Sequence, residues 1–276
     1  MQSALAEQLH EAWQKPLSGL PGRVGLQLRS AGSVIAELDP DGPHYPASTM
    51  KLAVLGALLE PGAGIAADEL LVGDVFPSAV GGQFRLDPAD DQDDLTWAHL
   101  GRPMAVAQLA ERMIVVSSNL ATDVLADRLG IHRVQDFVRR AGLEAGVSVR
   151  RLIGDTAAEA SGVTNTVTAA GLARLLEGLT DGSLLGASGA EQATALLAGQ
   201  QHLDMIAAGL PARTWSASKG GWVAGVNHDV ALVRPESAPE YVLAVCTSTG
   251  LSHEDGCAVV AELSRLTWEH WTAWHS

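Results

Sequence analysis

The sequence predicts an α+β fold, with one antiparallel sheet built from both ends of the chain and an all-helical part between them. Three observations predict it. Short segments with strand patterns occur before residue 39 and again after residue 213. The intervening chain carries apolar residues at helical spacing, in segments that end at glycine or proline. Strands and helices therefore fall in separate runs, which favours α+β over alternating βαβ units.

We expect a single domain over residues 1–276. Its sheet part should cover about residues 1–45 and 212–276, and its helical part about 46–211, because the strand patterns occur only near the ends. The first elements expected are a helix over 4–13, strands over 23–29 and 34–38, a loop over 39–43 and a helix over 47–59. Ala31-Gly32 supplies the turn of a hairpin, and the last helix is apolar on almost every side, which predicts burial.

The remaining elements follow in the same way. Pro103 suits the first turn of a helix, and Gly130 and Gly142 each suit a helix end. The expected helices cover 103–116, 119–129, 131–141, 168–179, 190–200 and 252 to the C-terminus; the expected strands cover 214–218, 229–233 and 241–247; residues 150–165 lack periodicity and predict a loop.

The composition excludes several classes of protein. Hydrophobic residues make up 47% of the chain, enough for a sizeable core. The formal net charge of -14 would repel a nucleic-acid backbone or an anionic membrane, so we expect neither as a partner. We expect a monomer or weak dimer that acts on a small molecule.

Cysteine use and the N-terminus bear on the compartment. Cys246 lies in an apolar run and Cys257 near the start of a helical pattern. A disulfide and two buried free thiols both fit, and the free thiols are favoured. Residues 1–17 contain no apolar core of a signal peptide. The sequence as written predicts a cytoplasmic protein, or an extracytoplasmic one if a leader has been removed.

The chain contains three lysines, Lys15, Lys51 and Lys219, and two of them lie in short motifs. Lys51 closes Ser48-Thr49-Met50-Lys51, at the start of the apolar helix. Lys219 opens Lys219-Gly220-Gly221 beside a strand pattern. Buried lysine can lose its proton whereas arginine effectively cannot, so lysine at these points suits a general base.

Each motif also has a structural interpretation. Ser48 could cap a helix with Lys51 on the surface, although the apolar helix makes a buried lysine more plausible. Ser117-Ser118-Asn119, which lies between the two lysine motifs, is typical of a helix N-cap. Lys219-Gly220-Gly221 could be a strand end with a bulge.

Taken together, the three motifs resemble those of the serine β-lactamase and penicillin-binding-protein superfamily, and the order of elements resembles class A β-lactamases along the whole chain. The resemblance implies a β-lactamase/transpeptidase-like fold. It also implies roles for particular residues. Ser48 would be the acylated nucleophile, Lys51 its general base, and Ser117 a proton shuttle toward the leaving nitrogen.

The same resemblance implies the substrate-binding residues. Asn119 would hold an amide of the substrate and contact Lys51, and Lys219 would attract a substrate carboxylate. Gly220, Gly221 and Trp222 would line the strand that faces the substrate, and the backbone N–H groups of Ser48 and Trp222 would form the oxyanion hole. Burial, with Lys219 nearby, would favour the deprotonated form of Lys51.

Three departures from the family pattern stand out. Ser118 replaces the aspartate of Ser-Asp-Asn, and Gly220 replaces the hydroxyl residue of Lys-Thr-Gly. The Glu-x-x-Leu-Asn motif, whose glutamate activates the deacylating water, has no counterpart in residues 150–165. Asp155 and Glu159 are the nearby acids; a solvated loop position is the favoured interpretation of both, with Asp155 ahead as a deacylation acid.

Other patterns predict no cofactor or metal. The acid-rich residues 87–94 lack the spacing of a calcium loop and predict a solvated loop. The histidines show no spacing typical of metal ligands, and adjacent His228 and Asp229 should point to opposite faces of a strand. Trp268, Trp271 and Trp274 form a helical stripe that predicts packing of the last helix on the sheet.

The function expected is hydrolysis of a β-lactam or related cyclic amide through a Ser48 acyl-enzyme, with a carboxylate-bearing substrate. The missing glutamate predicts that deacylation is the slow step. A D-peptidase or esterase of the same superfamily is the alternative reaction. A module that binds or senses β-lactams or peptides without turnover is the alternative of another class. A protein that kept only the fold would have little reason to retain a lysine in an apolar helix.

Overall fold

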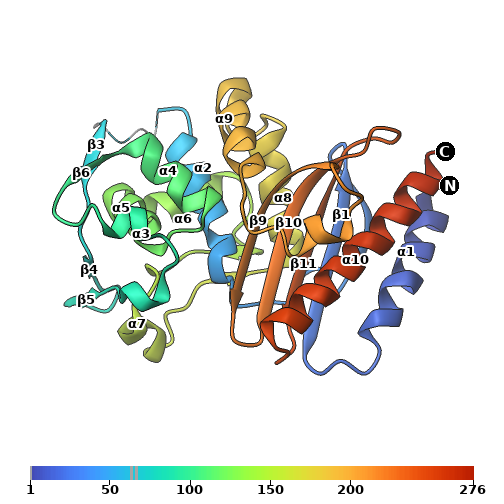
Figure 1. Ribbon diagram of the computed structural model, residues 1–276, viewed down its shortest axis with the longest axis horizontal. Helices are drawn as coiled ribbons and strands as arrows, with labels where there is room; N and C mark the ends of the chain where they lie inside the picture. The colour runs from blue at the N-terminus through green and yellow to red at the C-terminus, as the bar shows by residue number, and fades with distance from the viewer. Residues whose placement is uncertain (1, 63–64, 66–67) are drawn as a thin grey trace. The chain divides into compact units, whose positions relative to one another are not determined.

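The computed structural model describes residues 2–62, 65 and 68–276. Its five-stranded antiparallel sheet has the order β2-β1-β11-β10-β9 (Figure 1). The strands are β1 (Arg23–Ser30), β2 (Ser33–Leu38), β9 (Trp215–Val223), β10 (Val226–Arg234) and β11 (Tyr241–Ser248). The predicted α+β fold, with a sheet from both ends of the chain, is confirmed.

The N-terminal hairpin forms because two consecutive residues accept positive φ angles. Ala31 has a φ of 48° and Gly32 a φ of 77°, which reverse the chain between β1 and β2. A bulge at Leu28 and Arg29 shifts the register of the pair. On its other side β1 pairs with β11, so the two ends of the chain are joined by backbone hydrogen bonds.

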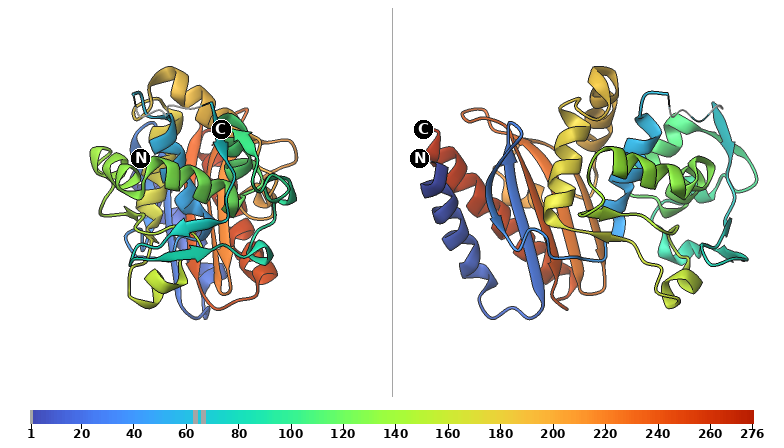
Figure 2. Two further views of the ribbon diagram at one scale, coloured as in Figure 1. Left: turned by 90° about the vertical axis from the view of Figure 1, so that its left-hand side faces the viewer. Right: turned by 180° about the vertical axis from the view of Figure 1, so that it is seen from behind.

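Helices α1 (Gln2–Leu17) and α10 (His253–Trp274) lie side by side on one face of this sheet (Figures 1 and 2). They bury leucines of α1, the inward side chains of the strands and the expected tryptophan stripe of α10. Trp13 Nε1 donates to Thr267 Oγ1 at 2.9 Å, which fixes one helix against the other. Trp271 belongs to the core, and Trp268 and Trp274 pack against it, as the sequence predicts.

The helical part contains one buried helix surrounded by others. The helix α2 (Lys51–Leu59) follows a short 3-10 turn, η1 (Ala47–Met50), and eight of its residues are buried. The chain between β2 and β9 also forms the helices α3 (Asp94–Trp97), α4 (Val106–Val115), α5 (Asn119–Leu129), α6 (Ile131–Arg140), α7 (Thr156–Ala160), α8 (Ala169–Thr180) and α9 (Gly186–Ala198). Further 3-10 turns are η2 (Pro88–Asp90) and η3 (Ile206–Gly209).

Several short strands were not predicted. They are β3 (Glu69–Leu71), β4 (Val75–Pro77), β5 (Gln83–Arg85), β6 (Pro103–Ala105), β7 (Val147–Ser148) and β8 (Thr166–Val167). The placement of Pro103 in the first turn of a helix is wrong: Pro103 begins β6, and α4 begins at Val106. Proline is tolerated at the first residue of a strand, where its missing N–H need not join a ladder.

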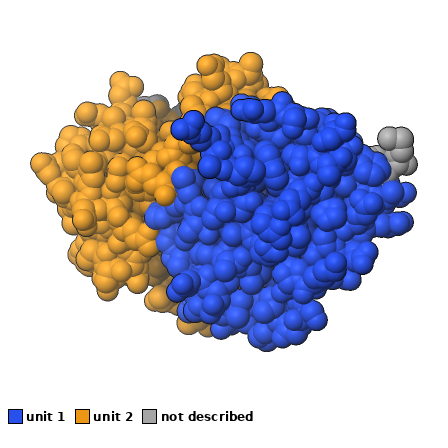
Figure 3. Space-filling view, turned by 45° about the vertical axis from the view of Figure 1, so that its right-hand side comes forward, with its two compact units in different colours: residues 1–49, 167–177, 202–276 blue, residues 50–166, 178–201 orange. Residues whose placement is uncertain are grey.

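The chain divides into two compact units (Figure 3). Unit 1 comprises residues 1–49, 167–177 and 202–276, and unit 2 comprises 50–166 and 178–201. The sequence assigned 167–177 to the helical part. These residues belong to unit 1 because Glu177 accepts from Arg29 Nε at 2.6 Å and the backbone of Val167 pairs with His44.

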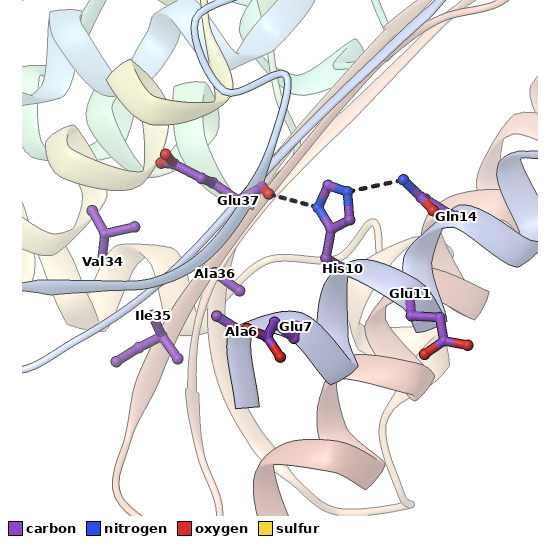
Figure 4. Close-up of a pocket in the computed structure, with 9 residues that line it drawn as sticks. All are labelled: Ala6, Glu7, His10, Glu11, Gln14, Val34, Ile35, Ala36 and Glu37. Atoms are coloured by element: carbon purple, nitrogen blue, oxygen red, sulfur yellow. Dashed lines mark hydrogen bonds between the residues drawn. The ribbon is translucent and has the colours of Figure 1, made fainter. Parts of the chain in front are cut away.

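A shallow groove of unit 1 runs between α1 and the edge strand β2 (Figure 4). Glu37 and His10 meet across it, where the carbonyl oxygen of Glu37 lies 3.3 Å from His10 Nδ1. None of the predicted site residues lines this groove. Both cysteines are free and buried, which confirms the favoured interpretation. Within the described residues, no helix has the length and hydrophobicity needed to cross a membrane.

Candidate active site

Lys51 is the first residue of α2 and is fully buried. Its Nζ donates to the carbonyl oxygen of Ser117 at 2.6 Å, to Ser117 Oγ at 3.1 Å and to Asn119 Oδ1 at 2.8 Å. These contacts lie within unit 2 and join the first and second sequence motifs. Burial of an amine is costly unless it is hydrogen-bonded, and this group of acceptors meets that need. Lys51 is therefore built into a polar cluster and is no surface residue.

The segment Ser117-Ser118-Asn119 connects α4 to α5. Ser117 has a φ of 61°, which is unusual for a residue with a side chain. Ser118 Oγ accepts from the N–H of Ala121 at 3.1 Å, so Ser118 caps α5. The capping interpretation thus holds for Ser118, while Ser117 and Asn119 face Lys51.

The acid-rich loop before this segment is not merely solvated, so that prediction is wrong. Asp91 accepts hydrogen bonds from the N–H groups of Asn119 at 3.0 Å and Leu120 at 2.8 Å. Its Oδ2 also accepts from Ser118 Oγ at 3.3 Å. Asp93 is buried and accepts from Arg112 Nε at 3.0 Å. A carboxylate at a helix N-terminus is stabilised by the free N–H groups and the helix dipole, and it orients Asn119. The sequence offered only the density of acids as a signal.

Ser48 lies in the turn η1, in unit 1, and is partly exposed. Its backbone lies against strand β9 at Gly221: a Cβ atom built on Gly221 would be 2.5 Å from the nitrogen of Ser48 and 2.8 Å from that of Thr49. Only glycine allows so close an approach. Trp222, the next residue of β9, lies on the edge strand of the sheet. Ser48 and the strand that carries Gly220, Gly221 and Trp222 are therefore neighbours.

Lys219 lies inside β9 rather than at a strand end, and its side chain is fully buried. Burial lowers the pKa of Lys219 to about 7, opposed by the charge of Asp229. Nζ donates to the carbonyl oxygen of Gly220 at 2.6 Å. Burial in turn raises the pKa of Asp229 to about 6, although the hydrogen bond from the N–H of Ile206 and the charge of Lys219 both lower it. The charge of Lys219 is thus poised to change near neutral pH.

Two buried histidines hold the loop that leads to Ser48. His228 Nε2 lies 2.8 Å from the carbonyl oxygen of Tyr45, and His228 Nδ1 accepts a hydrogen bond from the N–H of Thr247 at 3.0 Å. Burial lowers the pKa of His228 to about 4, so the ring is neutral with its proton on Nε2. His44 packs edge-on against His228, with ring centroids 5.2 Å apart. His228 has this positioning role, and it is not a candidate metal ligand.

The model of the family described as "Beta-lactamase enzyme family" matches residues 6–271. The chain belongs to the β-lactamase enzyme family. No curated protein sequence matches the chain significantly.

Solved structures of β-lactamases share the fold. An ancestral class A β-lactamase, reconstructed for the last common ancestor of Gram-negative bacteria, is 26% identical, with a TM-score of 0.75 over 96% of this chain and 99% of that one. A β-lactamase from Xanthomonas campestris is 21% identical, with a TM-score of 0.78 over 96% and 98%. A mutant of PBP-A, solved as an acyl-enzyme complex with penicillin G, is 21% identical, with a TM-score of 0.79 over 95% of both chains. The β-lactamase/transpeptidase-like fold is confirmed.

The two acids considered for deacylation in this family member have other partners. Asp155 is fully buried and caps α7: it accepts from the N–H of Ala158 at 3.1 Å, Ser78 Oγ at 2.9 Å and the N–H of Ala79 at 2.8 Å. Its interpretation as a solvated residue is wrong. Glu159 is exposed and pairs with Arg151 at 2.9 Å. Both oxygens of Asp155 are engaged, which suits a structural carboxylate better than a base.

Asp123 is a buried acid that sequence reasoning missed. It lies in α5, one turn after Asn119, and its Oδ1 accepts from the N–H of Ile153 at 2.9 Å. Oδ2 has no hydrogen-bond partner among the described residues. Burial raises the pKa of Asp123 well above its usual range, opposed by the N–H of Ile153 and the charge of Lys51. Asp123 therefore ties the loop after residue 150 to the helix that carries Asn119.

Proposed function

We propose that this chain is a serine hydrolase that opens a β-lactam or a related cyclic amide through an acyl-enzyme on Ser48. The observation that carries the proposal is the buried Lys51, held by Ser117 and Asn119 at the start of a helix whose preceding turn contains Ser48. A protein that only kept the fold would gain nothing from burying an amine there. Membership of the β-lactamase family supports the same activity.

The proposed reaction begins with attack of Ser48 Oγ on the carbonyl carbon of the ring amide. The neutral form of Lys51 takes the Oγ proton on its Nζ lone pair. Ser117 then gives its hydroxyl proton to the amide nitrogen as the C–N bond breaks, and receives one from Lys51, so both residues return to their starting forms. A hydroxyl can both donate and accept, so Ser117 suits a relay between an amine and the leaving nitrogen. The N–H groups of Ser48 and Trp222 would stabilise the oxyanion, and water would then hydrolyse the ester.

Substrate selection would depend on two further groups. Lys219 would attract a carboxylate on the substrate, and Asn119 would hold an amide of its acyl side. Gly220 offers no hydroxyl where the family pattern has Thr or Ser. We therefore expect this chain to bind a carboxylate more weakly than a chain with that hydroxyl, by roughly 0.5–1.5 kcal/mol, the net value of one hydrogen bond. A D-peptide or an ester with a carboxylate would fit the same groups.

One observation favours a second candidate function, in which the protein binds and is acylated without efficient turnover. Asp155 and Glu159 both have structural partners, and residues 150–165 contain no glutamate in the family's deacylation motif. Without a base to activate the water that hydrolyses the ester, the acyl-enzyme would persist. Such a protein would sense β-lactams or peptides rather than destroy them.

Intact-protein mass spectrometry after mixing with penicillin G and with an activated ester distinguishes these functions. A competent hydrolase consumes the substrate and shows no lasting adduct. A binding protein gains the mass of one acyl group and keeps it. Ser48→Ala is the control for both, and a wild-type protein that neither gains mass nor consumes either substrate refutes acyl transfer through Ser48.

A further inference from the structure

A cluster of three metal-ligating side chains lies in unit 1 and includes none of the residues assigned to acyl transfer. Asp204, His253 and Cys257 each present one ligand atom, and these atoms lie within 4.8 Å of one another. His253 and Cys257 stand four residues apart at the start of α10, so they share one face of that helix. Asp204 comes from the segment just before η3. Sequence reasoning considered spacing among the histidines and overlooked the pair His253 and Cys257, which stand four residues apart, as well as the distant Asp204.

The distances within the cluster fit tetrahedral zinc. Cys257 Sγ lies 3.3 Å from Asp204 Oδ2 and 3.7 Å from His253 Nε2, and His253 Nε2 lies 3.3 Å from Asp204 Oδ2. Zinc bonds of about 2.3 Å to sulfur and about 2.0–2.2 Å to nitrogen and oxygen, at tetrahedral angles, separate such atoms by roughly 3.4–3.6 Å. Each observed separation is within about 0.3 Å of that range. The cluster needs little movement to enclose an ion.

A neighbouring side chain is placed to orient the histidine. Asn227 is buried, and its amide nitrogen lies 2.8 Å from His253 Nδ1, which is as far from Cys257 Sγ, 3.7 Å, as Nε2 is; Nε2 is the ring nitrogen that pairs with Asp204. Turning the amide by 180° brings its oxygen to the same place, where it would accept from Nδ1–H and leave the Nε2 lone pair for a metal. Ligating histidines usually have such a partner on the second nitrogen.

The exposure of the three side chains leaves room for a further ligand. Cys257 is buried, whereas the side chains of His253 and Asp204 are 46% and 49% exposed. Three protein ligands with an open position toward solvent are typical of zinc sites that hold water or a small molecule as the fourth ligand. The mixture of thiolate, imidazole and carboxylate suits Zn²⁺ better than Mg²⁺ or Ca²⁺, which prefer oxygen alone.

We propose that Asp204, His253 and Cys257 form a binding site for Zn²⁺, with water as the fourth ligand. The Zn–S bond forms as the Cys257 thiol gives its proton to solvent, so each bound ion displaces one proton. The site is next to β9, the strand that lies against the proposed nucleophile: the rings of His253 and Trp222 have centroids 5.2 Å apart, and Trp222 follows Gly221. An ion held by His253 would therefore fix one side of Trp222.

A second interpretation of the cluster is a hydrogen-bonded group with no metal, in which the thiol donates to Asp204. Both interpretations explain the distances, but they differ in a spectroscopic property. A thiolate bound to Co²⁺, which replaces Zn²⁺ in tetrahedral sites, gives an intense charge-transfer band in the near ultraviolet. A thiol that donates a hydrogen bond gives none.

The test is titration of the metal-free protein with Co²⁺, followed by displacement with Zn²⁺. We expect a charge-transfer band that saturates at one Co²⁺ per chain and disappears when Zn²⁺ is added. Cys257→Ser should abolish the band and His253→Gln should weaken Co²⁺ binding at least tenfold. Cys246→Ala is the matched control, because Cys246 is the other buried free cysteine, lies in β11 and is not one of the three ligands, and it should retain the band.

Two results would overturn the proposal. One is a wild-type protein without the band at millimolar Co²⁺. The other is a band that survives in Cys257→Ser. Circular dichroism checks the fold of each variant, and His253→Gln, which changes a half-exposed side chain, carries the test if Cys257→Ser does not fold. The readout is binding, so it stands whether or not the chain hydrolyses a β-lactam.

Discussion

Replacement of Gly221 by alanine tests whether the close approach of β9 to Ser48 matters for acylation. The added methyl would lie 2.5 Å from the nitrogen of Ser48, and an ordinary contact begins near 3.4 Å. The backbone around Ser48 must therefore move by about 0.9 Å. A displacement near 1 Å at a reacting group can reduce a rate by about 100-fold. We expect Gly221→Ala to acylate about 100-fold more slowly than the wild type.

The matched control is Gly220→Ala, one residue earlier in the same strand. Its methyl would meet the flexible end of the Met205 side chain at 2.6 Å, and the nearest backbone atom, the oxygen of His228, is 3.5 Å away. Methionine can turn aside, so acylation should fall only several-fold. The assay is the rate of adduct formation with penicillin G, measured by mass spectrometry of samples quenched at successive times. Urea denaturation confirms that each variant is folded.

Two results for Gly221→Ala and Gly220→Ala would contradict this reasoning. If Gly221→Ala acylates within threefold of the wild type, Ser48 does not depend on this contact. If both variants lose activity equally while remaining folded, the loss comes from the strand as a whole and the argument from the Ser48 backbone is wrong.

Three further predictions concern charge and capping. Because the pKa of Lys219 is lowered to about 7, its positive charge is present below that pH and lost above it. For a carboxylate-bearing substrate, kcat/KM should therefore fall above about pH 7, whereas for a neutral ester it should not. In Lys219→Arg, whose side chain stays charged, kcat/KM should no longer depend on pH in this range. Asp91→Ala removes the acceptor for the N–H groups of Asn119 and Leu120, so urea denaturation should show a loss of about 1–2 kcal/mol, and Asp91→Asn a smaller one; equal stability of both variants would contradict the capping role. Asp155→Asn should also lower stability by about 1–2 kcal/mol without prolonging the acyl-enzyme, and a longer-lived adduct would instead make Asp155 the deacylation base.

The elements set by local pattern could be predicted from the sequence. The hairpin at Ala31-Gly32 depends on a turn, and the buried α2 depends on an apolar run, so both are visible within a few residues. Strand β9 was expected over 214–218, which is too short, and glycine inside a strand is unfavourable in general. It continues to Val223, where Gly221 accommodates the backbone of Ser48.

The features that escaped prediction depend on contacts between distant segments. Asp91 resembles its acidic neighbours until the start of α5 is placed beside it. Asp204 joins His253 and Cys257 only in three dimensions. The site residues could be proposed because the motifs around Ser48, Ser117 and Lys219 are compact, and the geometry of Lys51 then joined two of them.

The pairing of β1 with β11 has a consequence for synthesis of the chain. The N-terminal hairpin leaves the ribosome about 210 residues before its partner strand, a delay of roughly 10–40 s at 5–20 residues per second. Throughout that time its apolar face and the open edge of β1 are uncovered, and such edges invite aggregation. Residues 50–166 of unit 2 form one continuous segment and are synthesised within this interval. The hairpin can complete its pairing only once β11 has been synthesised, so it is the part of the sheet that waits longest for its partner.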